Sequence, residues 1–214
     1  TFDDKVSVLG NGNYDFTLGF RNAFSYKNLS MSVLVDMKFG ADVYSMSKMQ
    51  SHVNGTSKET LEGREGWYAS EQARLSANVD AKDWTPTGGY VGKGVKAVTD
   101  ADGNVSYVPN DVYVDPAKYW QALQNSSPEP FICDNSFVKL REVSLSYSCP
   151  KKWFVHTPIE SVTLSAYGRN LLLIYSKVDN IDPESSYNNG NGQGFEYGSL
   201  PSRRTFGFGI NVKF

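Results

Sequence analysis

The residues of this 214-residue chain that could do chemistry gather first in two oxygen-rich stretches. The stretch "DADGN" at 100–104 begins like a calcium loop, with side-chain oxygens at its first, third and fifth positions. Its sixth position is Val105 where such a loop needs glycine, and its twelfth is Asp111 where it needs glutamate. A hairpin turn at Asp102–Gly103 is therefore the better interpretation.

The second stretch, "DNIDPESSYNNGNGQG" at 179–194, contains Asp182, Glu184 and Tyr187. Its oxygens could hold a metal ion, but a polar loop of turn-forming residues explains the same composition. We expect neither a metal nor a cofactor. The sequence also offers no plausible Ser-His-Asp or Cys-His arrangement and no recognisable carboxylate pair, so we expect no enzymatic activity.

Aromatic side chains crowd the acidic segment 40–136. They could stack on sugar rings or bind a protein partner, but for any single residue the favoured interpretation is packing in the small core that so long a segment needs. Both interpretations stay open. The candidates for contact with cargo or a partner are Trp67, Tyr68, Trp84, Tyr90 and Trp120, together with Asp182, Glu184 and Tyr187.

Strands must position these groups, because five segments alternate apolar and polar residues with period two. The predicted strands are 14–26, 29–39, 137–148, 161–174 and 203–214. Each is roughly twice the average globular strand of about 5–6 residues, and long enough for the 9–11 residues that cross a membrane. Strand length therefore favours a barrel wall.

Three local features shape these strands. Only Lys27 and Asn28 separate the first two, which predicts a tight hairpin. In 137–148 the apolar phase slips at Arg141–Glu142, and a β-bulge there would return the apolar side chains to one face. In 161–174, Gly168 is a candidate for another bulge.

In a barrel wall, the alternation assigns side chains to lipid or lumen. The lipid-facing residues of the last strand would be Phe206, Phe208, Ile210, Val212 and Phe214. The lumen-facing residues would be Asp36, Lys38, Arg203, Asn211 and Lys213.

The connections alternate in length, which is typical of outer-membrane barrels. The short turns at 27–28 and 149–160 would lie on the periplasmic side, and the long segments at 40–136 and 175–202 would be extracellular. The expected fold class is an all-β, antiparallel up-and-down transmembrane β-barrel fragment, with residues 1–13 as a lead-in and 14–214 as the wall. The long segment should also hold a hairpin at 95–99 and 105–108, a helix capped by Asp115, and helix near 70–77.

Composition and the cysteines add limits. The net charge is −2 with no basic block, which argues against a nucleic-acid partner. The sequence contains no run of about 18 apolar residues, so we expect no transmembrane helix. No signal peptide is visible at Thr1. Cys133 and Cys149 flank the third strand, about 40 Å apart at 3.3 Å per residue, which is too far for a disulfide.

From about residue 13 to 214, the sequence resembles the C-terminal part of SusC/RagA-family TonB-linked outer-membrane transporters. The resemblance lies in the order and spacing of motifs. These are "FSYKNLSMSVLVDMKFGADVYS" at 24–45, "FVKLREVSLSYSCPKKW" at 137–153, "SVTLSAYGRNLLLI" at 161–174 and "NIDPESSYNNGNGQGFEYGSLPSRRTFGFGINVKF" at 180–214. Residues 46–130 carry little of the resemblance, so substrate specificity could differ there.

The resemblance implies a barrel of about 22 strands around a plug, located in the bacterial outer membrane. It implies TonB-driven import of oligomeric nutrients, either glycans or peptides, with a SusD-like surface lipoprotein as partner. The plug, the TonB-contacting part and most of the wall would lie outside this chain. We therefore expect a fragment, or one chain of a divided protein.

A different class of function stays open beside it. Five long strands and Trp/Tyr-rich loops also suit a secreted β-sandwich that binds carbohydrate. The barrel hypothesis predicts that the isolated chain needs detergent or partner strands, whereas the sandwich hypothesis predicts a soluble monomer.

Overall fold

The computed structural model describes residues 6–185 and 190–214, so Tyr187 lies outside the described residues. The chain divides into two compact units. One consists of residues 47–131, and the other combines 6–46 with 132–214. Each is described by itself.

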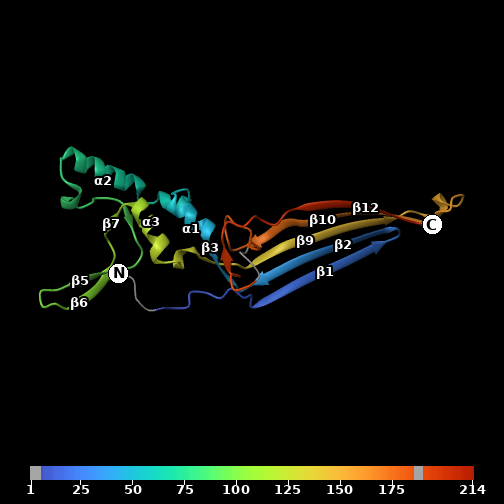
Figure 1. Cartoon of the computed structure of the whole chain (residues 1–214), viewed down its shortest axis with the longest axis horizontal. Coiled ribbons are helices and arrows are strands. Elements are labelled where there is room, and N and C mark those ends of the chain that lie inside the picture. Colours follow the sequence, from blue (N-terminus) through green and yellow to red (C-terminus); the bar gives the residue numbers. More distant parts are fainter. Residues whose placement is uncertain (1–5, 186–189) are drawn as a thin grey trace. The chain divides into compact units, whose positions relative to one another are not determined.

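The second unit is built on a five-stranded antiparallel sheet, hereafter the wall, with the strand order β1-β2-β9-β10-β12 (Figure 1). Neighbours in the sheet are also successive long strands along the chain, so the wall is an up-and-down meander. Its strands are β1 (Phe16–Tyr26), β2 (Leu29–Phe39), β9 (Phe137–Ser148), β10 (Ser161–Ser176) and β12 (Thr205–Lys213).

The predicted strands agree closely with those observed. The bounds 29–39 and 137–148 are confirmed to the residue, while the fourth strand runs on to Ser176 and the last covers only 205–213. The last strand therefore leaves out Arg203 and Phe214. The fold is mostly β, with 40% of the residues in strands and 22% in helices, and the wall is antiparallel as predicted. The described α-helices all lie within residues 46–126, the long segment in which helices were expected.

The bulge predicted at Arg141–Glu142 is confirmed. Leu34 of β2 pairs with Glu142 and Val35 pairs with Leu140, so Arg141 is the extra residue. The bulge expected at Gly168 is wrong, because Gly168 pairs regularly with Val143 and Phe206. The irregularities of β10 fall a little later, between Arg169 and Leu172 and between Leu173 and Tyr175.

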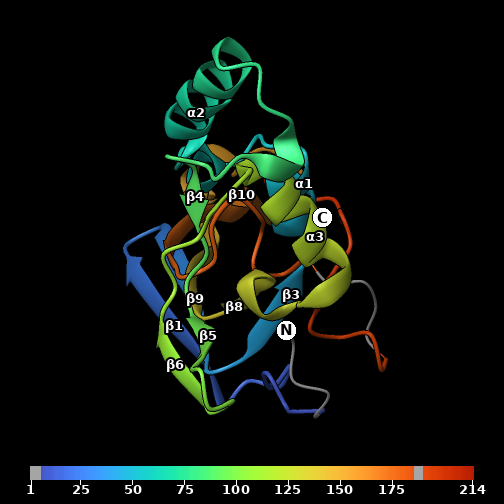
Figure 2. The ribbon, with the colours of Figure 1, turned by 90° about the vertical axis from the view of Figure 1, so that its left-hand side faces the viewer.

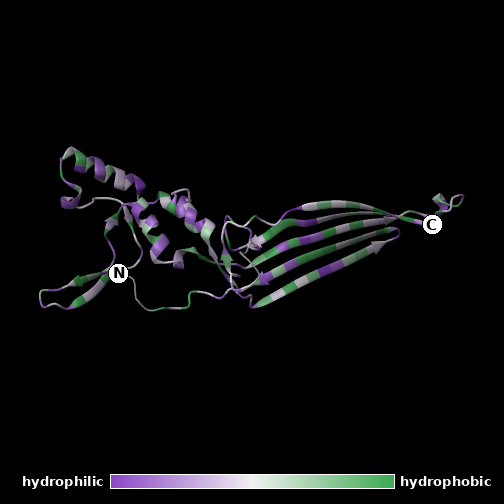
Figure 3. Cartoon of the chain, viewed as in Figure 1, coloured by the Kyte–Doolittle hydropathy of each residue, from purple (hydrophilic) through white to green (hydrophobic). Residues whose placement is uncertain are grey.

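The register gives the wall one apolar face and one polar face, because directly paired residues of antiparallel strands share a face. One row across all five strands is Tyr26, Leu29, Tyr147, Leu164 and Ile210. The row beside it on the apolar face is Phe24, Met31, Leu145, Ala166 and Phe208. The opposite face carries the row Ser25, Ser30, Ser146, Ser165 and Gly209. Figure 3 shows this as alternating green and purple bands along the strands.

A small three-stranded sheet has the strand order β11-β3-β8. Its strands come from segments that follow β2, precede β9 and follow β10 in the chain. Its central strand β3 (Asp42–Ser45) pairs antiparallel with β8 (Ile132–Asp134) and parallel with β11 (Phe195–Glu196). The Ser45 hydroxyl donates to Glu196 over 2.9 Å, and both residues are almost fully buried. This buried pair fixes loop residues 195–196 to the start of the long segment.

The first unit contains three helices: α1 (Met46–Val53), which begins at its boundary, α2 (Arg64–Ser76) and α3 (Pro116–Ser126). Helix α3 starts as predicted, because Asp115 accepts a hydrogen bond from the Ala117 backbone N–H over 2.9 Å. The predicted hairpin is confirmed as β5 (Val95–Thr99) and β6 (Val105–Pro109).

The remaining elements of the first unit are short: η1 (Lys58–Leu61), η2 (Ala81–Asp83), β4 (Tyr90–Val91), β7 (Tyr113–Val114) and η3 (Glu129–Phe131). The other unit also contains η4 (Lys151–Trp153).

Aromatic rings form the small core of the first unit. Helices α1 and α3 lie next to each other (Figures 1 and 2). The rings of His52 on α1 and Trp120 on α3 are 4.6 Å apart. Tyr90 packs on Trp120 at 5.7 Å, and Trp84 donates its indole N–H to the Ser70 hydroxyl over 3.1 Å. Within the described residues, no helix is long and apolar enough to cross a membrane.

Candidate functional site

An ion cluster lies on the polar face of the wall, where the loop after β10 returns to β9. Its members are Asp36 of β2, Lys139 and Arg141 of β9, and Asp182 and Glu184 of the loop. Charges of both signs lie within hydrogen-bond reach, so each buried charge has a partner.

Lys139 forms one centre of the ion cluster. Its ammonium donates to Asp182 over 3.0 Å, to Glu184 over 2.7 Å and to the Ser202 hydroxyl over 3.1 Å. The residue is 3% exposed. One cation thus joins two points of the loop that are twenty residues apart.

Arg141 forms the other centre, and it is the bulge residue. Its guanidinium donates to both Glu184 oxygens, over 2.6 and 2.8 Å, and to Asp36 over 2.5 Å. It also donates to the side-chain oxygen of Asn170 over 2.7 Å. The bulge therefore lets one arginine join the wall strands β2 and β10 to the loop.

The two loop carboxyl groups are held ionised. Burial would raise the pKa of Asp182, but hydrogen bonds from Ser202, the Glu184 backbone N–H and Lys139 outweigh it and lower this pKa to about 2. Burial opposes ionisation of Glu184 as well, and the hydrogen bonds from Arg141 and Lys139 still lower its pKa. Both loop carboxyl groups are therefore ionised at neutral pH.

Beside the ion cluster is a cavity of about 310 Å³ with Tyr14, Lys38, Asn135 and Glu184 in its lining. Burial, Glu184 and Asp36 raise the pKa of Tyr14 to about 12, and its hydroxyl accepts from the Asn135 side chain over 2.9 Å. Lys38 lies 3.9 Å from Glu184. Asp36 and Lys38 thus share the polar face that the alternation assigned to them.

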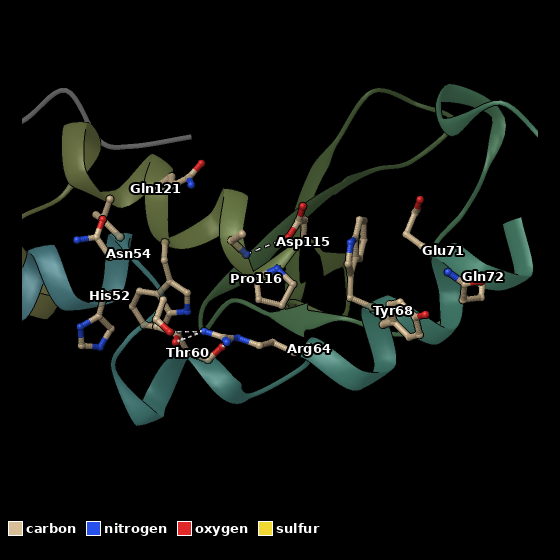
Figure 4. Close-up of a pocket in the computed structure, with 15 residues that line it drawn as sticks. His52, Asn54, Thr60, Arg64, Tyr68, Glu71, Gln72, Asp115, Pro116 and Gln121 are labelled. Atoms are coloured by element: carbon tan, nitrogen blue, oxygen red, sulfur yellow. Dashed lines mark hydrogen bonds between the residues drawn. The ribbon is translucent and has the colours of Figure 1, made fainter. Parts of the chain in front are cut away.

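A second cavity lies within the first unit and is hereafter the trough. Its volume is about 720 Å³, and it is bounded by α2, the start of α3 and the turn after α1. Figure 4 shows Arg64, Tyr68, Glu71 and Gln72 along α2, with Asp115 and Pro116 at the start of α3. These α2 residues are spaced so that they share one face of a helix.

The structure places the predicted site residues in the trough, in the core of the first unit, in the ion cluster and on β12. Trp67, Tyr68 and Trp120 line the trough. Trp84 and Tyr90 pack inside the unit, and Asp182 and Glu184 belong to the ion cluster. Phe206, Phe208, Ile210 and Val212, which the sequence predicts to face lipid, share one face of β12, whereas Asn211 and Lys213 lie on the other.

The sequence prediction missed Lys139, Arg141, Arg64, Gln72 and Asp115 as site residues. Lys139 had a signal, because it is a cation on the polar phase of a long strand beside the bulge. Arg64, Tyr68 and Gln72 had one too, since they recur every four residues and so share one helix face.

Comparison with known proteins gives two groups of relatives. "TonB-dependent receptor P3" of Formosa agariphila is 27% identical over 220 residues, and "TonB-dependent receptor P26" of the same organism is 30% identical over 217. The alignments cover 100% and 99% of this chain, which spans only 18% of each relative's length. No protein-family model matches the chain.

Among solved structures, the fold is similar to the RagAB peptide transporter, with a TM-score of 0.54, 18% identity, and coverage of 95% of this chain and 17% of that one. The RagAB peptide importer in its closed-closed state gives a TM-score of 0.58 at 16% identity, covering 97% of this chain and 18% of that one. At this level of identity, the likeness concerns the fold.

Proposed function

We propose, from the premise that this chain is a segment of a SusC/RagA-like TonB-dependent receptor of the outer membrane, that its five long strands form part of the barrel wall of a nutrient importer. The observation that carries the proposal is the two-faced register of the wall. Complete apolar rows lie on one face and serine- and glycine-rich rows on the other. A barrel in lipid needs this arrangement.

The apolar face is the lipid face. Phe206, Phe208 and Ile210 are 69%, 88% and 73% exposed, so nothing among the described residues covers them. A sandwich would bury such a row under a second sheet, and a membrane would cover it with acyl chains. The uncovered face therefore favours the barrel wall over the secreted β-sandwich.

The polar face lines the lumen. Asp36, Lys38, Asn211 and Lys213 lie on it, and the ion cluster holds the loop after β10 against the same face. We place the segments 40–136 and 175–202 on the extracellular side. There they contribute to the entrance through which cargo reaches the lumen.

The cargo is an oligomeric nutrient, a glycan or a peptide, and the energy comes from the TonB system through parts of the receptor outside this chain. A SusD-like lipoprotein serves as the surface partner. The likeness to the RagAB peptide transporter supports a transport role. No cofactor or metal takes part in this proposal.

A pair of arginine substitutions on one strand tests the wall. Phe208→Arg places a charge on the lipid face, which costs about 2–4 kcal/mol near the bilayer midplane. Asn211→Arg, on the other face of β12, is the control. We expect folded receptor in isolated outer membranes to fall several-fold for Phe208→Arg and to stay at the parent level for Asn211→Arg. Equal levels of the two variants would reject the assignment of faces.

A further inference from the structure

The trough has the shape of a binding groove for a short chain molecule. Arg64 and Gln72 are eight residues apart on α2, so this wall of the trough runs for about 12 Å. Its volume of about 720 Å³ falls within the range of ligand pockets. All of its lining residues belong to the first unit, in which residues 47–131 are described throughout.

Both exposed and buried aromatic side chains line the trough. Tyr68 is 68% exposed, and Trp67 is half-buried beside it. Trp120 is 7% exposed, and its indole N–H has no hydrogen-bond partner among the described residues. The Trp120 donor is buried, so the exposed ring of Tyr68 is the feature that favours a ligand with apolar C–H surface.

The charges of the trough are balanced. Arg64 is held in place, because it donates to the Gly55 and Thr60 carbonyl oxygens over 2.7 Å each and to the Thr60 hydroxyl over 2.5 Å. Asp115 uses one oxygen to cap α3. Glu71 is paired with Arg74 through both of its oxygens. One cation and one carboxylate therefore remain for a ligand, so the lining has no excess of either charge, which disfavours a ligand of high net charge.

The walls offer side chains rather than backbone to a ligand. The lining comes from helices and from the turns at their ends, and no strand contributes to it. One common way of holding an extended peptide is through main-chain hydrogen bonds to a strand edge, which this lining does not supply. Asn54, Gln72 and Gln121 instead supply amide groups suited to hydroxyls.

We infer that the trough binds a short, uncharged oligosaccharide, with one sugar ring stacked on Tyr68 and its hydroxyls bonded to Arg64, Gln72 and Asp115. This inference rests on the proposed import function, and it selects sugar over peptide as the class of cargo. It also assigns capture of the sugar to the long segment 46–130, where the sequence departs from the family motifs.

The test uses the full-length receptor, purified in detergent. Its probes are neutral oligosaccharides of glucose, galactose, mannose and xylose, with tryptic peptides of casein as the competing class. Binding is followed by calorimetry and by the fluorescence of the tryptophans. We expect at least one neutral oligosaccharide to bind and the peptides not to displace it.

Matched variants locate the binding. Tyr68→Ala should weaken sugar binding by about tenfold, which corresponds to 1.4 kcal/mol. Tyr107→Ala is the control, because Tyr107 is 71% exposed on β6 and does not line the trough. Gln72→Ala gives a second reading on the other end of the trough. Circular dichroism and detergent gel filtration check that all variants are folded.

Three outcomes would overturn the inference. The peptides bind and the sugars do not; no probe binds up to about 1 mM, the weak end of specific affinity; or Tyr68→Ala binds sugar as well as Tyr107→Ala does. None of these touches the barrel wall, which is judged by Phe208→Arg and Asn211→Arg alone. Failure of the trough and failure of the import proposal are therefore separate results.

Discussion

The Lys139 side chain is almost fully buried, and three oxygen partners surround its ammonium in place of water. A buried ion pair adds little net stability, but removal of one partner leaves an uncompensated charge behind. The energetic importance of Lys139 therefore lies in the cost of losing it. In Lys139→Met, Asp182 and Glu184 would stay buried with less compensation.

We expect Lys139→Met to cost about 3 kcal/mol of stability and to free the loop 179–194. The measurement is the temperature at which folded receptor in SDS converts to its unfolded gel mobility, together with chymotrypsin cleavage within 179–202, a stretch that contains aromatic residues but no lysine or arginine before Arg203. Lys213→Met is the control, because Lys213 pairs with Glu160 at the exposed end of β12. The same shift in both variants would show that the position of the charge does not matter.

Acid should release the same loop. Folding lowers the pKa of Asp182 from its ordinary value of 3.8 to about 2, so its contribution is complete above about pH 4 and is lost as the pH falls through 2. This shift corresponds to about 2 kcal/mol, and the lowered pKa of Glu184 acts in the same direction.

Pepsin cleavage within 179–202, normalised to an unstructured peptide, should therefore rise steeply between about pH 4 and pH 2. Asp182→Asn has no charge to lose at this position. Its cleavage should already be raised at pH 4 and should change less with pH. A parent protein whose cleavage stays flat to pH 2 would contradict the ion cluster as the restraint.

At the scale of elements, helix α2 is placed by a close backbone approach at its first turn. Gly63 precedes α2 with φ of +79°, and a Cβ there would strike the backbone of Gly89 and Tyr90. Only glycine combines this left-handed conformation with so close an approach. The position of α2, and with it one wall of the trough, depends on this glycine.

A left-handed alanine costs about 1–2 kcal/mol by its backbone conformation alone. Gly63→Ala should cost more than this and destabilise α2, because its Cβ would also clash with the backbone of Gly89 and Tyr90. Gly103→Ala is the control, because Gly103 has φ of +84° in the β5–β6 turn with open space around it. We expect hydrogen exchange of the 64–76 amides to quicken in Gly63→Ala. In Gly103→Ala, faster exchange should stay at the hairpin tip.

The elements also show what sequence can and cannot predict. The wall strands were predictable because each repeats a period of two over many residues, and β9 was still readable through its bulge. The β11-β3-β8 sheet was not, because it joins strands of two to four residues from distant segments. The ion cluster was missed for the same reason: Arg141 and Glu184 were visible as residues, but their pairing across 43 positions leaves no local pattern.

At the scale of the whole molecule, the chain presents an apolar sheet face and two sheet edges, β1 and β12. Such a face and such edges associate in water. We expect the isolated 214-residue chain to aggregate in buffer and to become uniform in size only in detergent. Sedimentation with and without detergent measures this. A stable monomer without detergent would instead favour the secreted β-sandwich over the barrel wall.

The bulge at Arg141 has a consequence for how the length of this chain can vary. Removing one residue from an ordinary strand turns everything beyond it inside out, because each side chain changes face. In β9, loss of Arg141 would instead leave Val138 and Leu140 in phase with Val143 and Leu145, and both faces would survive. A deletion at position 141 would thus spare the apolar face and remove the contacts of Arg141 with Glu184, Asp36 and Asn170, while Lys139 would still hold the loop.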